Sequence, residues 1–256
     1  MNELETPVYA ANWKMHKGPS DTRTFVREFR DRYAVHDDRT VLFFPPSISV
    51  PAFREASEGR EDLGLGVQDV HQELEGAHTS AVSASMAADA GCGWGLAGHS
   101  ERRREFGDTD EQVAAKVARL ADEGLRPVLC VGETLEQRQA GELEDVLSRQ
   151  VETGLSALEP STRREVVFAY EPVWAIGTGE TAEPGDAREA HEYVREAVRR
   201  STDGEAAESA IILYGGSVKP HNARELLETP GLDGVLVGSA SLTAESFTKI
   251  CRALDD

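Results

Sequence analysis

Short apolar runs alternate along the chain with longer segments that have helical periodicity. Within the runs the apolar residues are continuous and do not alternate with polar ones. Such runs are typical of parallel strands that are covered on both faces. They predict strands near residues 7–12, 40–44, 63–68, 93–97, 126–131, 165–171, 209–214 and 233–237.

The segments between these runs carry apolar residues on one face of a helix. In residues 19–34, for example, Phe25 and Phe29 stand four positions apart, which places them on the same face. Asp108 or Thr109 is the expected N-cap of the helix that starts near residue 110. The same kind of pattern predicts helices over residues 109–124, 185–200 and 219–228.

Eight strand–helix units within 256 residues match the size of a closed (β/α)8 TIM barrel, which belongs to the α/β class. No low-complexity tract or Pro-rich linker divides the chain, so we predict a single domain over residues 1–256. An open, doubly wound sheet is the alternative that the pattern leaves open. In a barrel, the functional residues are expected just after the strands, on the C-terminal face.

The composition narrows the function and the location. The formal net charge of −19 disfavours nucleic-acid binding, because a phosphate backbone needs a basic patch. No apolar run is long enough for a membrane helix, and the acidic N-terminal segment lacks the features of a signal peptide. We therefore expect a cytoplasmic protein that binds neither membrane nor nucleic acid. Three widely spaced cysteines predict reduced thiols rather than disulfides or a zinc site.

Polar residues of catalytic type follow the first and the fourth apolar run. Asn12 and Lys14 lie two positions apart, so an extended segment would point both side chains to one side, toward an anionic ligand. His99 precedes Ser100, where a short helix is expected to start. The dipole at a helix N-terminus disfavours an imidazolium, and a neutral imidazole can shuttle a proton between neighbouring oxygens. Each signal is weak alone.

Glu171 ends the sixth run and precedes a segment with the composition of a lid. Residues 172–179 combine a proline hinge, an apolar tip and two glycines. A lid that closes over a carboxylate excludes water and raises its basicity. The backbone N–H of Gly177 is free of side-chain crowding, so we expect it to approach a phosphate group.

Turns of small residues follow the last two runs. The first contains Gly215, Gly216 and Ser217, and the second contains Gly238 and Ser239. Barrel enzymes commonly bind phosphate at this place, through backbone N–H groups and a helix N-terminus. The pair of turns therefore predicts a phosphate site.

With these segments in order, the chain resembles the triosephosphate isomerase family over essentially its whole length. The resemblance implies a cofactor-free and metal-free enzyme. It implies the interconversion of dihydroxyacetone phosphate and D-glyceraldehyde 3-phosphate by proton transfer through an enediolate. Two motifs, CVGET at 130–134 and VGSASL at 237–242, agree more loosely. The motifs that carry the resemblance are ANWKM at 11–15, GHSERR at 98–103, AYEPVWAIGTG at 169–179 and YGGSV at 214–218.

The resemblance also implies a role for individual residues. Glu171 would be the base, and neutral His99 would polarise the substrate oxygens, a pairing for which this family is itself the standard example. Lys14 and Asn12 would stabilise the enediolate. Glu101 would support the lysine, and Thr79 would reach into the partner's active site in a homodimer. The phosphate would be held by Gly177, Ser217, Gly238 and Ser239.

Several positions depart from the family pattern. Ser239 replaces a glycine near the expected phosphate, and Ala81 replaces the acid that is expected to pair with Arg102. This second change weakens the expectation of a dimer. Glu180 stands where the second hinge of the lid usually carries a lysine, and Asp69 stands where the third strand usually ends in asparagine.

Three alternatives remain open from the sequence. The first is a relative that isomerises a four-carbon ketose phosphate, such as erythrulose phosphate. The second is a barrel that binds sugar phosphate without converting it, although a binding module would not need the base Glu171. The third concerns Asp69, His71 and His78, which have the side chains of metal ligands but also suit an ordinary polar loop.

Overall fold

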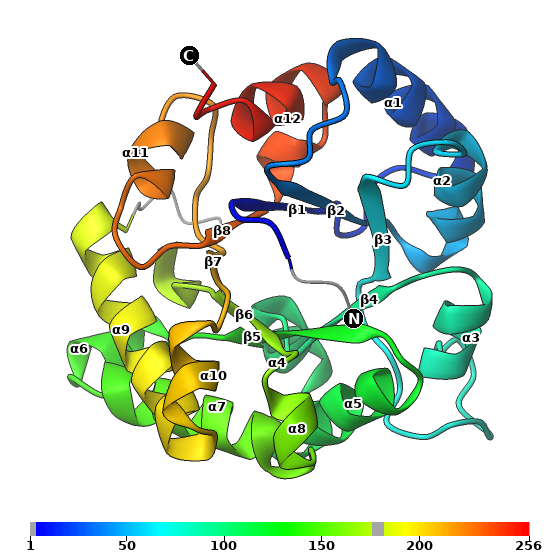
Figure 1. Ribbon diagram of the computed structural model, residues 1–256. Coiled ribbons are helices and arrows are strands. Elements are labelled where there is room, and N and C mark those ends of the chain that lie inside the picture. The colour runs from blue at the N-terminus through cyan, green and yellow to red at the C-terminus, as the bar shows by residue number, and fades with distance from the viewer. Residues whose placement is uncertain (1–3, 176–181, 256) are drawn as a thin grey trace.

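Eight parallel strands form a closed barrel in the computed structural model, which describes residues 4–175 and 182–255 (Figure 1). Each strand pairs with the next along the chain, and the last pairs with the first. The closed barrel confirms the predicted fold, and the alternative of an open sheet is wrong. The strands are β1 (Val8–Asn12), β2 (Thr40–Phe44), β3 (Leu63–Val67), β4 (Trp94–Ala97), β5 (Arg126–Val131), β6 (Val167–Tyr170), β7 (Ile212–Tyr214) and β8 (Gly234–Val237).

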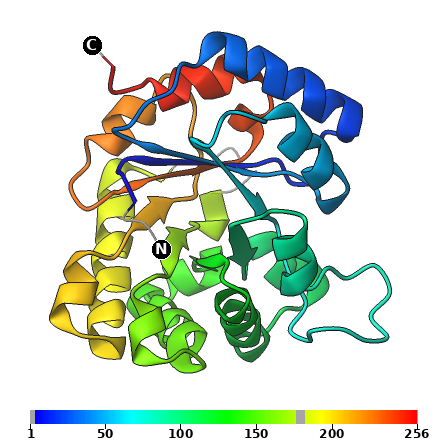
Figure 2. The ribbon, with the colours of Figure 1, turned by 45° about the vertical axis from the view of Figure 1, so that its right-hand side comes forward.

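Helices surround the barrel and cover its outer face (Figures 1 and 2). The four predicted helices are present, with ends that lie at most four residues from the predicted ones. The helices are α1 (Pro19–Arg32), α2 (Val50–Ala56), α3 (Ala84–Asp89), α4 (Ser100–Phe106), α5 (Asp110–Asp122), α6 (Leu135–Gln139), α7 (Leu143–Ser156), α8 (Pro160–Arg163), α9 (Pro184–Ser201), α10 (Gly204–Glu208), α11 (Ala223–Leu227) and α12 (Ala244–Cys251). None of the helices in the described part of the chain is long and apolar enough to cross a membrane.

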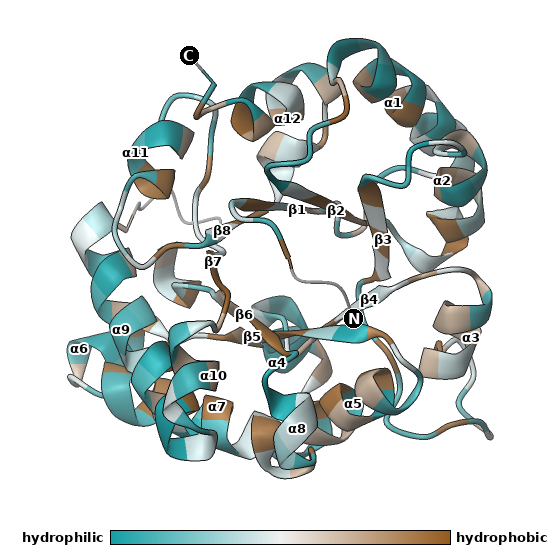
Figure 3. Cartoon of the chain, in the orientation of Figure 1, coloured by the Kyte–Doolittle hydropathy of each residue, from teal (hydrophilic) through white to brown (hydrophobic). Residues whose placement is uncertain are grey.

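The continuous apolar character of the strands follows from two cores on their two sides. In β2, Leu42 and Phe44 belong to the core inside the barrel, whereas Val41 and Phe43 belong to the core between strands and helices. Side chains that alternate along a strand point to opposite faces, so a strand with both faces covered needs apolar residues throughout. Figure 3 shows the apolar strands at the centre and polar residues on the outer sides of the helices.

Local sequence signals set the ends of the helices that position the site. Thr109 is the N-cap of α5 and forms a capping box with Gln112, which settles the choice between the two predicted caps. The side chain of His99 caps α4, and Gly107 ends the same helix in a left-handed conformation with φ of 76°. The helix α4 is therefore confined to seven residues, and only Gly98 and His99 separate it from β4.

A histidine of α9 is buried and neutral. His191 of α9 is 1% exposed, and its Nδ1–H donates to the carbonyl oxygen of Gly231 at 3.0 Å. Its ring meets the ring of Tyr170 edge-on, with centroids 6.0 Å apart. Burial lowers the pKa of His191 from 6.5 to about 4, and the hydrogen bond to Gly231 offsets only part of that shift.

This burial predicts that stability falls in mild acid. Between pH 6.5 and about 4 the unfolded chain protonates residue 191 and the folded chain does not. The free energy of unfolding should therefore fall by about 1.4 kcal/mol per pH unit, and by about 3 kcal/mol in all, through this group. Urea denaturation of the unchanged chain and of His191→Gln, at pH 7.5 to 4.5 and fixed protein concentration, measures the difference.

The two stability curves should converge as the pH falls, because Gln cannot take up a proton. The matched control is His221→Gln, since His221 is exposed. Its curve should run parallel to that of the unchanged chain. Parallel curves for His191→Gln would show that the buried imidazole does not carry the acid sensitivity.

Candidate active site

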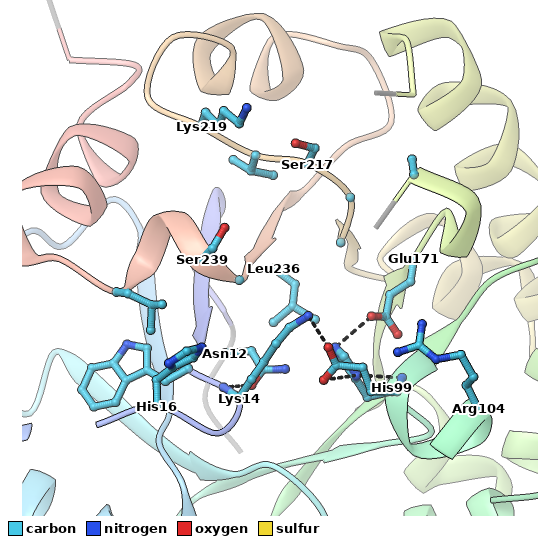
Figure 4. A pocket seen from close by; sticks show the side chains of 18 residues that line it. Asn12, Lys14, His16, His99, Arg104, Glu171, Ser217, Lys219, Leu236 and Ser239 are labelled. Carbon is cyan, nitrogen blue, oxygen red and sulfur yellow. Dashed lines mark hydrogen bonds and ion pairs between the residues drawn. The ribbon is translucent and has the colours of Figure 1, made fainter. Parts of the chain in front are cut away.

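A pocket of about 420 Å³ opens where the strands end, and Figure 4 shows the side chains that line it. Thr79 lies instead on the exposed loop between β3 and α3. Gly177 and Glu180 lie outside the described residues, as do residues 176–179 of the segment with lid composition. The predicted site residues that line the pocket are Asn12, Lys14, His99, Glu101, Glu171, Ser217, Gly238 and Ser239.

The carboxylate of Glu171 is buried and surrounded by hydrogen-bond donors. It is 2% exposed and directly follows β6. Ser100 donates its backbone N–H to Oε2 at 2.9 Å and its hydroxyl to Oε1 at 3.1 Å. The Nε2 atom of His99 lies 3.0 Å from Oε1.

These contacts decide the protonation state of Glu171. Burial raises the pKa of Glu171, but His99, the Ser100 N–H and the Lys14 ammonium lower it by more. The pKa therefore lies below its usual range, and the carboxylate is ionised at neutral pH. An ionised carboxylate is the form that can accept a proton from a substrate.

The position of His99 as N-cap of α4 selects its tautomer. The backbone N–H of Glu101 donates to Nδ1 of His99 at 3.2 Å. A neutral ring that accepts at Nδ1 carries its proton on Nε2, the nitrogen that faces Glu171. A neutral imidazole, as predicted from a helix start after His99, would present an N–H donor to the pocket in this position.

Lys14 is held in a strained conformation beside the carboxylates. Its φ of 50° lies in the left-handed region, which residues with a side chain rarely adopt. Asn12 accepts the Lys14 N–H at 3.0 Å, and Gln68 donates to the Lys14 carbonyl at 2.9 Å, so both neighbours stabilise this turn. The ammonium of Lys14 donates to Oε1 of Glu101 at 2.8 Å. Strain of this kind is often found at functional sites.

Two residues behind Glu171 were not predicted as part of the site. Glu133 is fully buried, and its Oε1 accepts from the hydroxyl of Tyr170 at 3.1 Å and from the indole of Trp174 at 2.7 Å. Gly132 touches the backbone of Glu171, and a Cβ at this position would lie 1.8 Å from the Glu171 carbonyl oxygen. Both residues follow β5, so the rule that functional residues follow the strands would have found them.

Three charged or titratable side chains of the pocket were also missed. They are His16, Arg104 and Lys219, which line the pocket together with the predicted residues. Each stands on a surface segment where a solvated charge is the usual interpretation, so no local sequence signal distinguishes it. Ser239 is exposed at the pocket and presents the hydroxymethyl group that the family's glycine lacks.

Arg102 has acidic partners although Ala81 replaces the acid that was expected to pair with it. Its guanidinium lies 3.4 Å from a carboxylate oxygen of Asp108 and 3.3 Å from one of Asp69. The buried ammonium of Lys116 binds the same two carboxylates at 2.5 and 2.8 Å. Asp69, the residue that departs from the family pattern, thus supplies an acid from within the chain.

Asp69, His71 and His78, which were considered as metal ligands, contact different groups. The carboxylate of Asp69 faces Lys116, whereas the rings of His71 and His78 stack on each other with centroids 3.9 Å apart. In the described residues these three side chains form no group that could hold a metal ion. The interpretation as a polar loop therefore fits the geometry better.

Together these groups define the class of the protein. An ionised carboxylate, an imidazole and an ammonium meet in one pocket with small-residue turns at its other side. These groups are typical of a barrel enzyme that performs acid–base chemistry on a small anionic substrate.

Comparisons with known proteins identify the family. The family model for triosephosphate isomerase matches residues 7–254. A protein of Symbiobacterium thermophilum is 46% identical over 250 residues, which cover 98% of this chain and 97% of the relative. Relatives from Nitratidesulfovibrio vulgaris strain DP4 and Roseiflexus sp. strain RS-1 are 47% and 43% identical over 251 residues, with at least 96% of either chain covered. All three are named triosephosphate isomerase, and the chain belongs to this family.

The relatives also bear on the substrate. Their shared name refers to the three-carbon phosphate, and their similarity extends over nearly the full length of both chains. The alternative of a four-carbon ketose phosphate is therefore not favoured. The alternative of a barrel that binds without converting is likewise not favoured.

The contact of Gly132 with Glu171 predicts a loss of activity in Gly132→Ala. The added methyl group would collide with the Glu171 carbonyl, so the backbone that carries the base must shift. A displacement of about 1 Å at a reacting group can lower the rate about 100-fold. We expect kcat/KM for the isomerisation of glyceraldehyde 3-phosphate to fall by about this factor. Gly185→Ala is the matched control, because nothing lies within 4 Å of a Cβ there.

Proposed function

We propose that Glu171, His99 and Lys14 carry out the proton transfers of this isomerase. The activity itself, the interconversion of dihydroxyacetone phosphate and glyceraldehyde 3-phosphate, is that of the family to which the chain belongs. The observation that supports the proposal most is the buried contact between an ionised Glu171 and the Nε2 atom of His99 at 3.0 Å.

In the proposed reaction, Glu171 accepts a proton from the carbon next to the carbonyl group of the substrate. The electrons of the broken C–H bond form the C=C bond of the enediolate, and the carbonyl oxygen gains negative charge. The Nε2–H of His99 donates to this oxygen and moves the hydroxyl proton between the two oxygens. Glu171 then returns its proton to the neighbouring carbon, which completes the isomerisation.

Positive charge near the enediolate lowers the barrier to its formation. Lys14 supplies this charge, and Asn12 holds the backbone of Lys14 in place. Glu101 positions the ammonium through its 2.8 Å ion pair. In the structure Glu171 is bound to Ser100 and His99, so a substrate must displace these contacts before the carboxylate reaches a carbon atom.

The phosphate group is proposed to bind opposite Glu171, at Ser217, Gly238 and Ser239. All three line the pocket and lie in turns of small residues after β7 and β8. Gly177 is included on the basis of the family resemblance alone, since it lies outside the described residues. A phosphate at this place would leave the carbon atoms of a triose within reach of the acid–base groups.

Shortening the base should reduce turnover while binding is retained. Glu171→Asp withdraws the carboxylate by about one methylene group, so we expect kcat to fall by about 100-fold or more. A coupled assay with glyceraldehyde 3-phosphate measures kcat, and competitive inhibition by inorganic phosphate measures binding. The inhibition constant should stay close to that of the unchanged chain.

Two results would contradict the assignment. Turnover of Glu171→Asp near that of the unchanged chain would remove Glu171 from the role of base. An unchanged chain that converts neither glyceraldehyde 3-phosphate nor dihydroxyacetone phosphate would contradict the function itself.

The protein is also proposed to be a homodimer. Among the described residues, apolar side chains stand exposed after three neighbouring strands: Met15 after β1, Ile48 after β2, and Leu74 and Met86 after β3. Met15 is 94% exposed, which is unusual for an apolar side chain beside an active site. Figure 2 shows the loop between β3 and α3, which carries Thr79, protruding from the barrel. A second copy that covers this loop would bury these side chains.

A charge placed in this surface should separate the two copies. Met86 is 63% exposed in the chain, so Met86→Glu should leave the barrel folded but weaken the dimer. Sedimentation equilibrium of the unchanged chain should give about twice the 27.8 kDa of one chain, and that of Met86→Glu a lower mass. The control is Val35→Glu, because Val35 is 65% exposed and lies before β2, on another part of the surface. A 27.8 kDa species for the unchanged chain at micromolar concentration would refute the dimer.

We further propose a cytoplasmic location, where the reactions of glycolysis take place. The single domain is proposed to extend over the whole of residues 1–256, because the pairing of β1 with β8 joins the two ends of the barrel.

A further inference from the structure

Lys219 differs from the other lysines of the chain in its surroundings. The chain has only five lysines. Lys14, Lys116 and Lys249 each bind a carboxylate. Lys17 lies over two aromatic rings. Within the described residues, the ammonium of Lys219 has no hydrogen bond or ion pair, and the side chain lines the active-site pocket.

The backbone around Lys219 is held in place by one side chain. Asn222 accepts the Lys219 N–H at 2.7 Å through Oδ1 and donates to the Ser217 carbonyl at 2.9 Å through Nδ2. Val218, between them, is buried. Figure 4 shows Lys219, Ser217 and Ser239 on one side of the pocket, opposite Glu171. A free cation is thus placed at the side where the phosphate is proposed to bind.

The negative charge of the protein makes a free cation at this place favourable for an anionic substrate. The substrate phosphate carries a charge near −2 at neutral pH, and the chain carries a formal charge of −19. Inside the pocket the ammonium of Lys14 is paired with Glu101. At its edge Arg104 is paired with Glu105 at 2.6 Å. A local region of positive potential that is not already neutralised would therefore speed the approach of a dianion.

We propose that Lys219 provides this potential and steers the phosphate group of the substrate into the pocket. The inference rests on the proposed function, since a neutral substrate would gain nothing from it. Steering acts on the encounter, so the charge of Lys219 should affect kcat/KM rather than kcat. Triosephosphate isomerase is itself a standard example of an enzyme whose kcat/KM reaches the diffusional ceiling, so a slower encounter appears directly in kcat/KM.

The test compares charge variants over a range of ionic strength. The variants are Lys219→Gln, Lys219→Glu and Lys219→Arg, and the matched control is Lys249→Gln. Lys249 loses the same charge but lies on α12 and does not line the pocket. Values of kcat and KM for glyceraldehyde 3-phosphate are measured from about 0.01 M to about 1 M KCl, where the screening length falls from about 30 Å to about 3 Å.

At low ionic strength we expect kcat/KM of Lys219→Gln to be about three- to tenfold below that of the unchanged chain. The decrease should be larger for Lys219→Glu and absent for Lys219→Arg, while kcat is retained throughout. In about 1 M KCl the differences should disappear, because the charge is screened. The proposal is overturned if Lys219→Gln behaves like Lys249→Gln at low ionic strength. It is also overturned if the loss persists in molar salt, since the residue would then be holding the turn.

Binding of inorganic phosphate, measured by calorimetry at low ionic strength, tests Lys219 without turnover. Weaker binding by Lys219→Gln than by Lys249→Gln supports the proposal, and equal binding overturns it. This measurement separates the two hypotheses. An unchanged chain without isomerase activity would refute the proposed function, and phosphate binding would still decide the role of Lys219.

Discussion

The pairing of β1 with β8 is the contact on which the rest of the molecule depends. It closes the barrel, with Val8 opposite Gly234. The close approach needs a glycine, because a Cβ at residue 234 would lie 2.1 Å from the Val8 carbonyl oxygen. Closure also builds the site, since it brings Lys14 after β1 beside Gly238 after β8. In an open sheet these segments would lie at opposite edges, and the ammonium of Lys14 would not lie near the turn that contains Gly238.

The acidic composition explains why so few cations of the site are free. The chain has 46 acidic residues against 27 basic ones, and three of its five lysines bind a carboxylate. Pairing fixes the position of Lys14, but it also reduces the field that an approaching anion experiences. Under the proposal for Lys219, a chain of this charge separates two tasks. Paired cations orient groups within the pocket, and Lys219, which has no ion pair among the described residues, attracts the substrate.

The sequence predicted the strands closely and the site only in part, for physical reasons. Both faces of each strand are buried, so an apolar run marks a strand almost to the residue, as in residues 40–44. The helix Leu143–Ser156 was not predicted, although Leu143, Val146 and Leu147 mark its buried face. Lys14 could be predicted because it lies within a recognisable motif, residues 11–15. Glu133 could have been found from its place after β5, but its contacts exist only after folding. The open space around Lys219 likewise exists only after folding, and no local pattern revealed this residue.

The state of the base is the result of two opposing effects. Burial is the largest influence on Glu171 and raises its pKa, while the donors of His99 and Ser100 and the charge of Lys14 lower it by more. Ser100 and His99 contact Glu171 only in the position seen in the structure. The burial of Glu171 comes from the pocket around it. A carboxylate that leaves Ser100 and His99 but stays excluded from water therefore gains basicity as it moves toward the substrate. In the proposed reaction, the resting contacts keep Glu171 ionised, and their loss on binding raises its basicity when it accepts a proton from carbon.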